Sequence, residues 1–237
     1  MSFCFISDLH IDNKRDDIKK AFFNFLNEIA SDFKNLFIIG DLFEVWVGDD
    51  YQDQTVLEVI KELKKFSSKG GNIFIMHGNR DFLLGKDFCN EFGGKIIDDP
   101  YIFEFNHKKI YVSHGDDFCT DDTEYHDFKK MVRSSEWQKN FLNETLNKRI
   151  EIANGLRKDS SSLNKNKDEY LMDVNISVIE SIALKESINV IIHGHVHRPK
   201  IHHEKFGIRY VLGDWDKNFW YLSLKESGFD LVSKAIK

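Results

Sequence analysis

The segment Phe3-Cys-Phe-Ile-Ser-Asp-Leu-His10 joins a short apolar run to an acidic residue and a histidine. Its first residues have the length and the β-forming side chains of a buried strand. The pattern recurs further along the chain, where Leu36-Phe-Ile-Ile39 runs into Gly40-Asp41 and Ile73-Phe-Ile-Met76 runs into His77-Gly-Asn-Arg-Asp81. Each predicted strand therefore ends in polar residues that can bind a ligand.

The segments between these strands have helical periodicity. Apolar residues recur at spacings of three and four over residues 18–33 and again over residues 56–63, and Gly70-Gly71 ends the second helix. The β-α-β-α-β order predicts a mostly parallel sheet. Because ligands bind beyond the carboxyl ends of the strands in such sheets, we expect the polar residues there to form one site.

The rest of the chain predicts shorter strands and a block of helices. Tyr101–Phe105 and Lys109–Ser113 predict a hairpin, and further strands are expected at 190–192, 210–212, 220–224 and 229–232. Residues 121–185 have helical patterning, and we interpret the part up to about residue 170 as an insertion. The sequence thus predicts one α/β domain over residues 1–237, with a helical cap at about 121–170.

Composition excludes several classes of protein. The formal net charge of −6 argues against a dedicated nucleic-acid binder. No apolar run approaches the roughly 18 residues that span a bilayer, and no basic stretch followed by an apolar one opens the chain. Three cysteines without a CxxC pattern favour a reducing compartment. We therefore expect a cytoplasmic protein.

Polar motifs follow five of the predicted strands. They are Asp8-Leu-His10, Gly40-Asp41, Gly78-Asn79-Arg80-Asp81, His114-Gly115 and Gly194-His195-Val196-His197. Any one of them can arise by chance, and a lone histidine at a strand end is more often a satisfied core residue. Together they supply seven nitrogen and oxygen ligands, about the number that two metal ions with one shared carboxylate need. Such mixed ligands without cysteine suit Mn²⁺, Fe or Zn²⁺ better than Ca²⁺.

The ordered motifs resemble those of the calcineurin-like metallophosphoesterase superfamily, whose fold is a pair of β-sheets flanked by helices. The resemblance implies two divalent metal ions, for which we expect Mn²⁺, roughly 3.5–4 Å apart with a water activated between them. It also implies two ligand sets that share Asp41 as the bridge: Asp8, His10, Asp41 and His197 for one metal, and Asp41, Asn79, His114 and His195 for the other.

Arg80 indicates the kind of bond that is cleaved. Many members of the superfamily carry a histidine at this position, which is assigned to protonating an alkoxide leaving group. Arginine cannot donate that proton because its pKa stays above about 12, but it can pair with phosphate oxygens through two parallel hydrogen bonds. A phosphate monoester, with a second pKa near 6, leaves as a stable anion without an acid. Unless Arg80 merely caps a turn, it favours cleavage of a P–O–P linkage.

Longer motifs resemble one family within the superfamily, the UDP-2,3-diacylglucosamine pyrophosphohydrolases of lipid A biosynthesis. The resemblance covers residues 5 to about 214, and its motifs are Gly40-Asp-Leu-Phe-Glu-Val-Trp-Val-Gly-Asp49, Gly78-Asn-Arg-Asp-Phe-Leu-Leu-Gly85, His114-Gly-Asp with Cys119-Thr-Asp-Asp122, Met172-Asp-Val-Asn175 and His193-Gly-His-Val-His-Arg-Pro199. It implies hydrolysis of UDP-2,3-diacylglucosamine to UMP and 2,3-diacylglucosamine 1-phosphate (lipid X), by hydroxide attack on the α-phosphorus.

The same resemblance implies roles for individual residues. Arg80 and His195 are the implied catalytic residues. The implied substrate contacts are Asn79, Arg80, Asp122, Ser160, Asn164, Lys167 and His195. Two other interpretations remain open: another nucleotide pyrophosphatase or phosphodiesterase of the superfamily, and a non-enzymatic scaffold that has lost its metals.

Residues 147–167 are locally basic. Six positive residues stand against Glu151 and Asp159 in this segment: Lys148, Arg149, Arg157, Lys158, Lys165 and Lys167. They form either a solvated helix face or a basic approach for a UDP-sugar and anionic lipid headgroups. Because the implied substrate carries two acyl chains, we expect peripheral association with the cytoplasmic face of the bacterial inner membrane, and no nucleic-acid or obligate protein partner.

Overall fold

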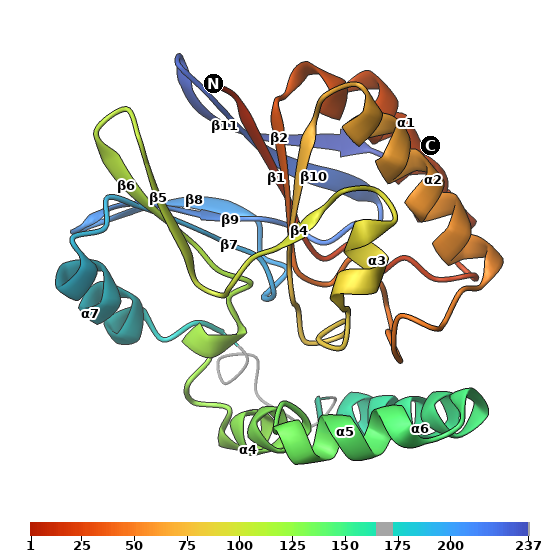
Figure 1. The fold of residues 1–237 in the computed structure, drawn as a ribbon. Coiled ribbons are helices and arrows are strands. Elements are labelled where there is room, and N and C mark those ends of the chain that lie inside the picture. The colour runs from red at the N-terminus through yellow and green to blue at the C-terminus, as the bar shows by residue number, and fades with distance from the viewer. Residues whose placement is uncertain (165–172, 237) are drawn as a thin grey trace.

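Two β-sheets form the centre of the computed structural model, which describes residues 1–164 and 173–236 (Figure 1). The strands in these ranges are β1 (Phe3–Ile6), β2 (Asn35–Ile39), β3 (Asn72–Met76), β4 (Lys95–Ile96), β5 (Tyr101–Phe105), β6 (Lys108–Val112), β7 (Val190–His193), β8 (Lys200–Glu204), β9 (Gly207–Val211), β10 (Asn218–Lys225) and β11 (Gly228–Ala235). The first sheet has the order β11-β10-β1-β2-β3-β4, and the second has the order β5-β6-β7-β9-β8.

Parallel pairing dominates the middle of both sheets. β1, β2, β3 and β4 are mutually parallel, whereas β10 and β11 pair antiparallel at one side. In the second sheet β6, β7 and β9 are parallel, and the edge strands β5 and β8 are antiparallel to their neighbours. The predicted β-α-β-α-β unit is therefore confirmed.

Helices cover the outer faces of the two sheets. Their bounds are α1 (Asp16–Glu28), α2 (Gln54–Ser68), α3 (Lys86–Asn90), α4 (Thr123–Val132), α5 (Ser135–Asn143), α6 (Leu146–Asn164) and α7 (Ile176–Glu186), with 3₁₀ turns at Ala30–Asp32 and Asp116–Phe118. α1, α2 and α3 pack against the first sheet in one apolar cluster, and α7 packs against the second sheet through Ile179 and Ala183. This arrangement confirms the expected pair of β-sheets flanked by helices.

Alternate residues of the inner strands face opposite layers. Cys4 and Ile6 of β1 pack toward the helices, whereas Phe3 and Phe5 pack between the sheets. There the Phe5 ring lies 5.0 Å from the ring of Phe37, measured between centroids. Because both faces of these strands are covered, their sequences are apolar at every position rather than at every second one. The two sheets are thus held face to face by a shared aromatic core.

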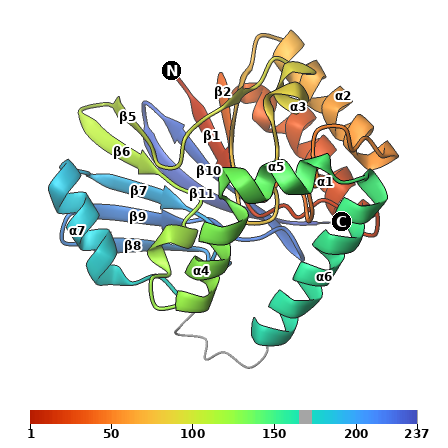
Figure 2. The same cartoon turned by 60° about the horizontal axis from the view of Figure 1, so that its bottom comes forward.

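α4, α5 and α6 form a separate layer beyond the carboxyl ends of β1, β2 and β3, as Figure 2 shows from the side where they come forward. Arg149 anchors α6, since its Nη1 donates to the carbonyl oxygen of Val47 at 2.6 Å and to Oδ1 of Asp50 at 2.7 Å. Within the described part of the chain, no helix combines the length and the apolar character that crossing a membrane requires.

Some elements differ from the sequence-based expectation. The predicted helix over residues 18–33 ends at Glu28, and a 3₁₀ turn follows it. β8 was not predicted, because Lys200-Ile-His-His-Glu204 has little apolar character. It forms as an edge strand that pairs with β9 through backbone hydrogen bonds. An edge strand has a neighbour on one side only, so its side chains can be polar.

Candidate metal centre

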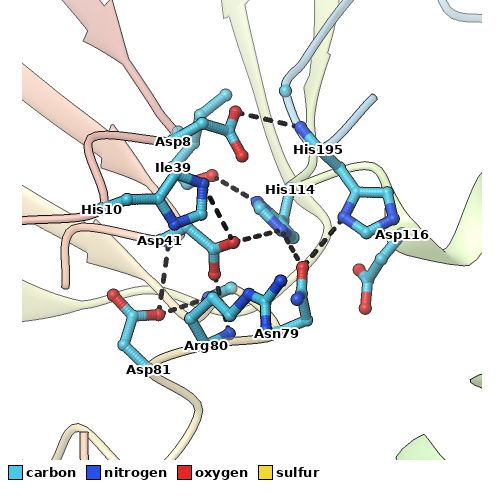
Figure 3. A network of polar contacts seen from close by, with 12 residues as sticks. Asp8, His10, Ile39, Asp41, Asn79, Arg80, Asp81, His114, Asp116 and His195 are labelled. Carbon is cyan, nitrogen blue, oxygen red and sulfur yellow. Dashed lines mark hydrogen bonds and ion pairs between the residues drawn. The ribbon is translucent and has the colours of Figure 1, made fainter. Parts of the chain in front are cut away.

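The predicted ligands come from the carboxyl ends of five strands in both sheets. Asp8 and His10 follow β1, Asp41 follows β2 and Asn79 follows β3 of the first sheet. The second sheet contributes His114 after β6, and His195 and His197 after β7. Figure 3 shows most of these side chains converging on one point between the two sheets. The structure therefore brings all seven predicted ligands together.

Left-handed backbone directs many of these side chains inward. The φ angles are 54° at Asp8, 50° at His10, 54° at Asp41, 67° at His195 and 52° at His197. Such values are uncommon for residues other than glycine and persist only where the surrounding structure enforces them. Their concentration at the strand ends indicates a functional site rather than an ordinary set of turns.

One group of ligands surrounds Asp8. Nε2 of His10 lies 3.4 Å from Nε2 of His197, and the latter lies 3.4 Å from Oδ1 of Asp8. The other oxygen of Asp8, Oδ2, accepts a hydrogen bond from the backbone N–H of His195 at 3.0 Å. Asp8, His10 and His197 thus point potential ligand atoms at a common centre.

A second group surrounds Asn79. Its Oδ1 lies 3.1 Å from Nε2 of His114 and 2.9 Å from Nδ1 of His195. Asp41 stands between the two groups, since its Oδ2 lies 3.8 Å from Nε2 of His10 and 3.8 Å from Nε2 of His114. Asp8 also lies within reach of both groups.

Asp81 fastens two of the ligand loops to each other. Its side chain is fully buried, and its oxygens accept hydrogen bonds from the backbone N–H of Gly78 and of Leu42, both at 2.8 Å. Gly78 must be glycine here, because a Cβ on it would lie 2.0 Å from Oδ1 of Asp41. The sequence analysis assigned no role to Asp81. The one signal in the sequence was its position at the end of the Gly78–Asp81 motif.

Burial and neighbouring charges shift the pKa values of several side chains in the site. Burial lowers the pKa of the His114 imidazole, but the facing carboxylates of Asp41 and Asp8 raise it by more, to about 9. Burial, together with the nearby charge on His114, lowers the pKa of His195 to about 4. Burial likewise raises the pKa of the Asp41 carboxyl. Buried carboxylates and imidazoles thus lie close enough to shift one another's pKa values strongly.

The donor set fits divalent cations. The Nε2 atoms of His10 and His197 face each other at close range, and Oδ1 of Asp8 is buried without a hydrogen-bond donor. Neutral imidazole nitrogens and a carboxylate oxygen that converge in this way can share a bound cation. Oxygen and imidazole nitrogen atoms in this mixture suit first-row metals of the Mn²⁺ to Zn²⁺ series.

The predicted substrate contacts are only partly described. Arg80 and Asn79 line a small cavity of about 100 Å³. Its other walls come from the loops after β2 and β3 and from α4, α5 and α6, and they include Trp46, Phe82, Tyr125, Phe128, Trp137 and Phe141. Nε of Arg80 is buried without a hydrogen-bond partner.

The remaining predicted contacts lie in or near the three helices. Asp122 caps α4, where its Oδ1 accepts from the backbone N–H of Tyr125 at 3.1 Å. Ser160 and Asn164 lie in the last turns of α6, but their side chains are outside the described residues, as is the whole of Lys167. The structure thus places Asn79, Arg80 and His195 at the candidate metal centre and gives Asp122 a capping role.

Ion pairs engage half of the basic residues of the 147–167 segment. Arg149 is buried against Asp50, Lys148 pairs with Glu151, and Arg157 pairs with Glu44. Lys165 and Lys167 lie outside the described residues. Arg149 is therefore directed into the molecule, which the composition of the segment did not indicate, whereas Lys148 and its partner remain at the surface.

The fold and the site together define a class of protein. The family model described as calcineurin-like phosphoesterase matches residues 1–199. A solved structure of an archaeal phosphodiesterase aligns with a TM-score of 0.52 at 16% identity, covering 99% of this chain and 100% of that one, and supports the same fold.

Curated relatives narrow the class. A protein of Chromohalobacter salexigens named UDP-2,3-diacylglucosamine hydrolase is 38% identical over 221 residues, which are 91% of this chain and 89% of that protein. A protein of Cellvibrio japonicus with the same name is 38% identical over 235 residues, 98% of each chain. This chain belongs to the UDP-2,3-diacylglucosamine hydrolase family of the calcineurin-like phosphoesterases.

Proposed function

We propose that the protein hydrolyses the pyrophosphate bond of UDP-2,3-diacylglucosamine in lipid A biosynthesis, releasing UMP and 2,3-diacylglucosamine 1-phosphate by attack of water on the α-phosphorus. The names of the relatives support the substrate. The observation that carries the bond type is Arg80, whose buried Nε has no partner and which lines the cavity beside Asn79. A fixed cation there matches a leaving phosphate, which needs charge neutralisation and no proton.

We propose that Asp8, His10, Asp41 and His197 hold one divalent ion and that Asp41, Asn79, His114 and His195 hold the other, with Mn²⁺ as the physiological metal. Asp41 is the better bridge than Asp8, because its Oδ2 is equally distant from His10 and His114. When bound, such ions lower the pKa of water and neutralise phosphoryl charge.

Side chains of this chain then orient the substrate. Arg80 pairs with non-bridging oxygens of the phosphate that leaves, through the two parallel hydrogen bonds of a guanidinium. His195 is held by Asn79 at its Nδ1 and by the ring of Tyr125, whose centroid lies 5.9 Å away, so its imidazole has little freedom to turn. Groups fixed in this way do not need to reorganise as charge develops in the transition state.

We propose that α4, α5 and α6 act as a cap that receives the acyl part of the substrate. The cavity beside Arg80 is walled by aromatic side chains of the first two of these helices, such as Phe128 and Trp137. Met131 and Leu142, on α4 and α5, remain 48% and 44% exposed, as expected for a surface that docks peripherally on the anionic inner membrane.

One assay decides the reaction. The chain, loaded with Mn²⁺, is incubated with UDP-2,3-diacylglucosamine in H₂¹⁸O, and UMP is isolated. We expect the label in UMP, and label in the sugar phosphate instead would refute attack on the α-phosphorus. Turnover of soluble nucleotides such as UDP-glucose without turnover of the acylated substrate would favour the broader nucleotide pyrophosphatase interpretation.

The membrane proposal has a separate test. Flotation with vesicles that contain anionic phospholipid should carry the protein at low salt and lose it at high salt. Met131→Glu combined with Leu142→Glu should lower the bound fraction, whereas Leu184→Glu, at an 83% exposed residue of α7, should leave it unchanged. Equal flotation of both variants would contradict docking through the cap.

A further inference from the structure

A carboxylate outside the predicted ligand set stands directly behind His10. Oε2 of Glu44 lies 3.0 Å from Nδ1 of His10, and the Glu44 side chain is only 16% exposed. Its position is fixed by backbone pairing, since Glu44 donates its N–H to the carbonyl oxygen of Ile11 at 3.1 Å, and Ile11 donates to Leu42 at 3.0 Å. The loop after β2 is therefore bound along the loop after β1.

This carboxylate and the ligand cluster lie on opposite sides of the His10 ring. Nδ1 lies within ion-pair distance of Glu44 without the geometry of a hydrogen bond, and Nε2 faces His197 at 3.4 Å. A negative charge beside Nδ1 favours the tautomer that carries its proton there, which leaves Nε2 able to bind a cation. His197 is arranged in the same sense, with Nδ1 3.6 Å from Oδ2 of Asp214. A carboxylate behind a ligand histidine fixes the tautomer and the orientation of its ring.

Glu44 also connects His10 to the helical layer. Its other oxygen, Oε1, forms an ion pair with Nη2 of Arg157, which lies on α6. Glu44 and Arg157 both line the small cavity beside Arg80 and a larger cleft of about 1040 Å³ on the other side of the loop. The pair therefore borders both spaces, and it links α6 to His10 through two side chains.

We infer that Glu44 is a positioning residue that orients His10 toward its metal, and that Arg157 makes this orientation depend on the placement of α6. The inference rests on the proposed metal centre. It predicts that removing the Glu44 carboxylate weakens metal binding in a chain that still folds, because none of the proposed ligands has been removed.

The experiment measures Mn²⁺ affinity without substrate, by competition with a chelating fluorophore. Glu44→Ala should bind Mn²⁺ about 10- to 100-fold more weakly than the unmodified chain, which is the usual effect of losing such a partner. Glu44→Gln should fall between the two, because it keeps the size of the side chain and an oxygen near Nδ1 but removes the negative charge. Glu58→Ala, which removes a partly exposed glutamate on α2 that pairs with Lys19 and lies outside the ligand motifs of the chain, should match the unmodified chain.

Further measurements separate positioning from folding. Thermal unfolding of the metal-free variants should coincide with that of the metal-free parent, and excess Mn²⁺ should restore the activity of Glu44→Ala. Arg157→Gln should weaken Mn²⁺ binding by a smaller factor, and an unchanged affinity would refute the contribution of α6.

Two outcomes distinguish the inference from the function on which it rests. If the unmodified chain binds no Mn²⁺, the proposed metal centre is wrong. If it binds Mn²⁺ and both Glu44 variants bind it equally well, the metal centre stands and the role of Glu44 is refuted. Glu44→Gln decides the matter should Glu44→Ala fail to fold, because it preserves the volume of the side chain.

Discussion

Replacing Asp81 should destabilise the chain even though Asp81 is not a proposed ligand. Its buried carboxylate accepts from Gly78 and Leu42 at 2.8 Å and from the backbone N–H of Asp41 at 3.3 Å. In Asp81→Ala the two close donors remain buried without an acceptor, and each such donor costs about 1–3 kcal/mol. The expected loss is therefore about 2–6 kcal/mol, a large part of the roughly 5–15 kcal/mol that stabilises a typical domain.

Asp81→Asn is the more informative variant because it keeps the shape of the side chain. Its single oxygen retains one of the two close donors, and its NH₂ group faces the other. The expected loss is about 1–3 kcal/mol, half of that in Asp81→Ala. Asp230→Asn, at an exposed position of β11, makes the same chemical change and should stay within about 0.5 kcal/mol of the parent.

The assay is equilibrium unfolding in urea, with a chelator present so that metal binding adds nothing to the stability of the folded state. Equal slopes of the transitions would show that the variants unfold from comparable native states. If Asp81→Asn unfolds within about 0.5 kcal/mol of the parent, the two ligand loops do not depend on this carboxylate and the reasoning is refuted.

Three further predictions concern ligand, charge and thiols. Asp41→Ala should remove metal and activity together while leaving the far-ultraviolet circular dichroism spectrum unchanged, and full turnover would contradict the assignment. Arg80→Ala should lower kcat/KM for UMP release by about 10²- to 10³-fold, and Arg80→Lys should recover only part, since lysine lacks the planar pair of donors. Burial raises the pKa of the thiols of Cys89 and Cys119 to about 12, and the pKa of Cys4 is raised as well. The folded chain should therefore resist iodoacetamide at pH 8 and lose stability as the pH rises above about 9, where the unfolded thiols ionise first. Rapid labelling of the native chain would contradict this.

Topology explains why the ligand motifs could be predicted from the sequence. β1, β2 and β3 are parallel neighbours, so the residues that follow them, such as Asp8 and Asp41, must meet at one edge. Apolar runs bounded by polar motifs are visible in the sequence, and they mark both the strands and that edge. The fold class followed from the same pattern together with the family resemblance.

Contacts that depend on loop backbone could not be predicted in this way. Asp81 and Glu44 lie in motifs that were quoted for other reasons, and nothing in residue type distinguishes a carboxylate that accepts backbone N–H groups from one that faces solvent. Their partners are fixed by left-handed residues such as His10 and Asp41, whose conformation no periodicity reveals. The burial of the Arg149 side chain could not be predicted either, because a basic helix face has the same composition whether it faces solvent or an aspartate.

The geometry of the candidate site depends on how the two sheets pack against each other. His114 and His195 belong to the second sheet, so they reach Asn79 only because Phe5 and Phe37 of the first sheet pack against the inner face of the second. A change between the sheets, far from any ligand, would therefore act on the site by altering the separation of its halves. Because cores tolerate volume changes poorly, such a change should loosen the ligands that the second sheet contributes before it loosens Asp8 and Asp41, which share a single sheet.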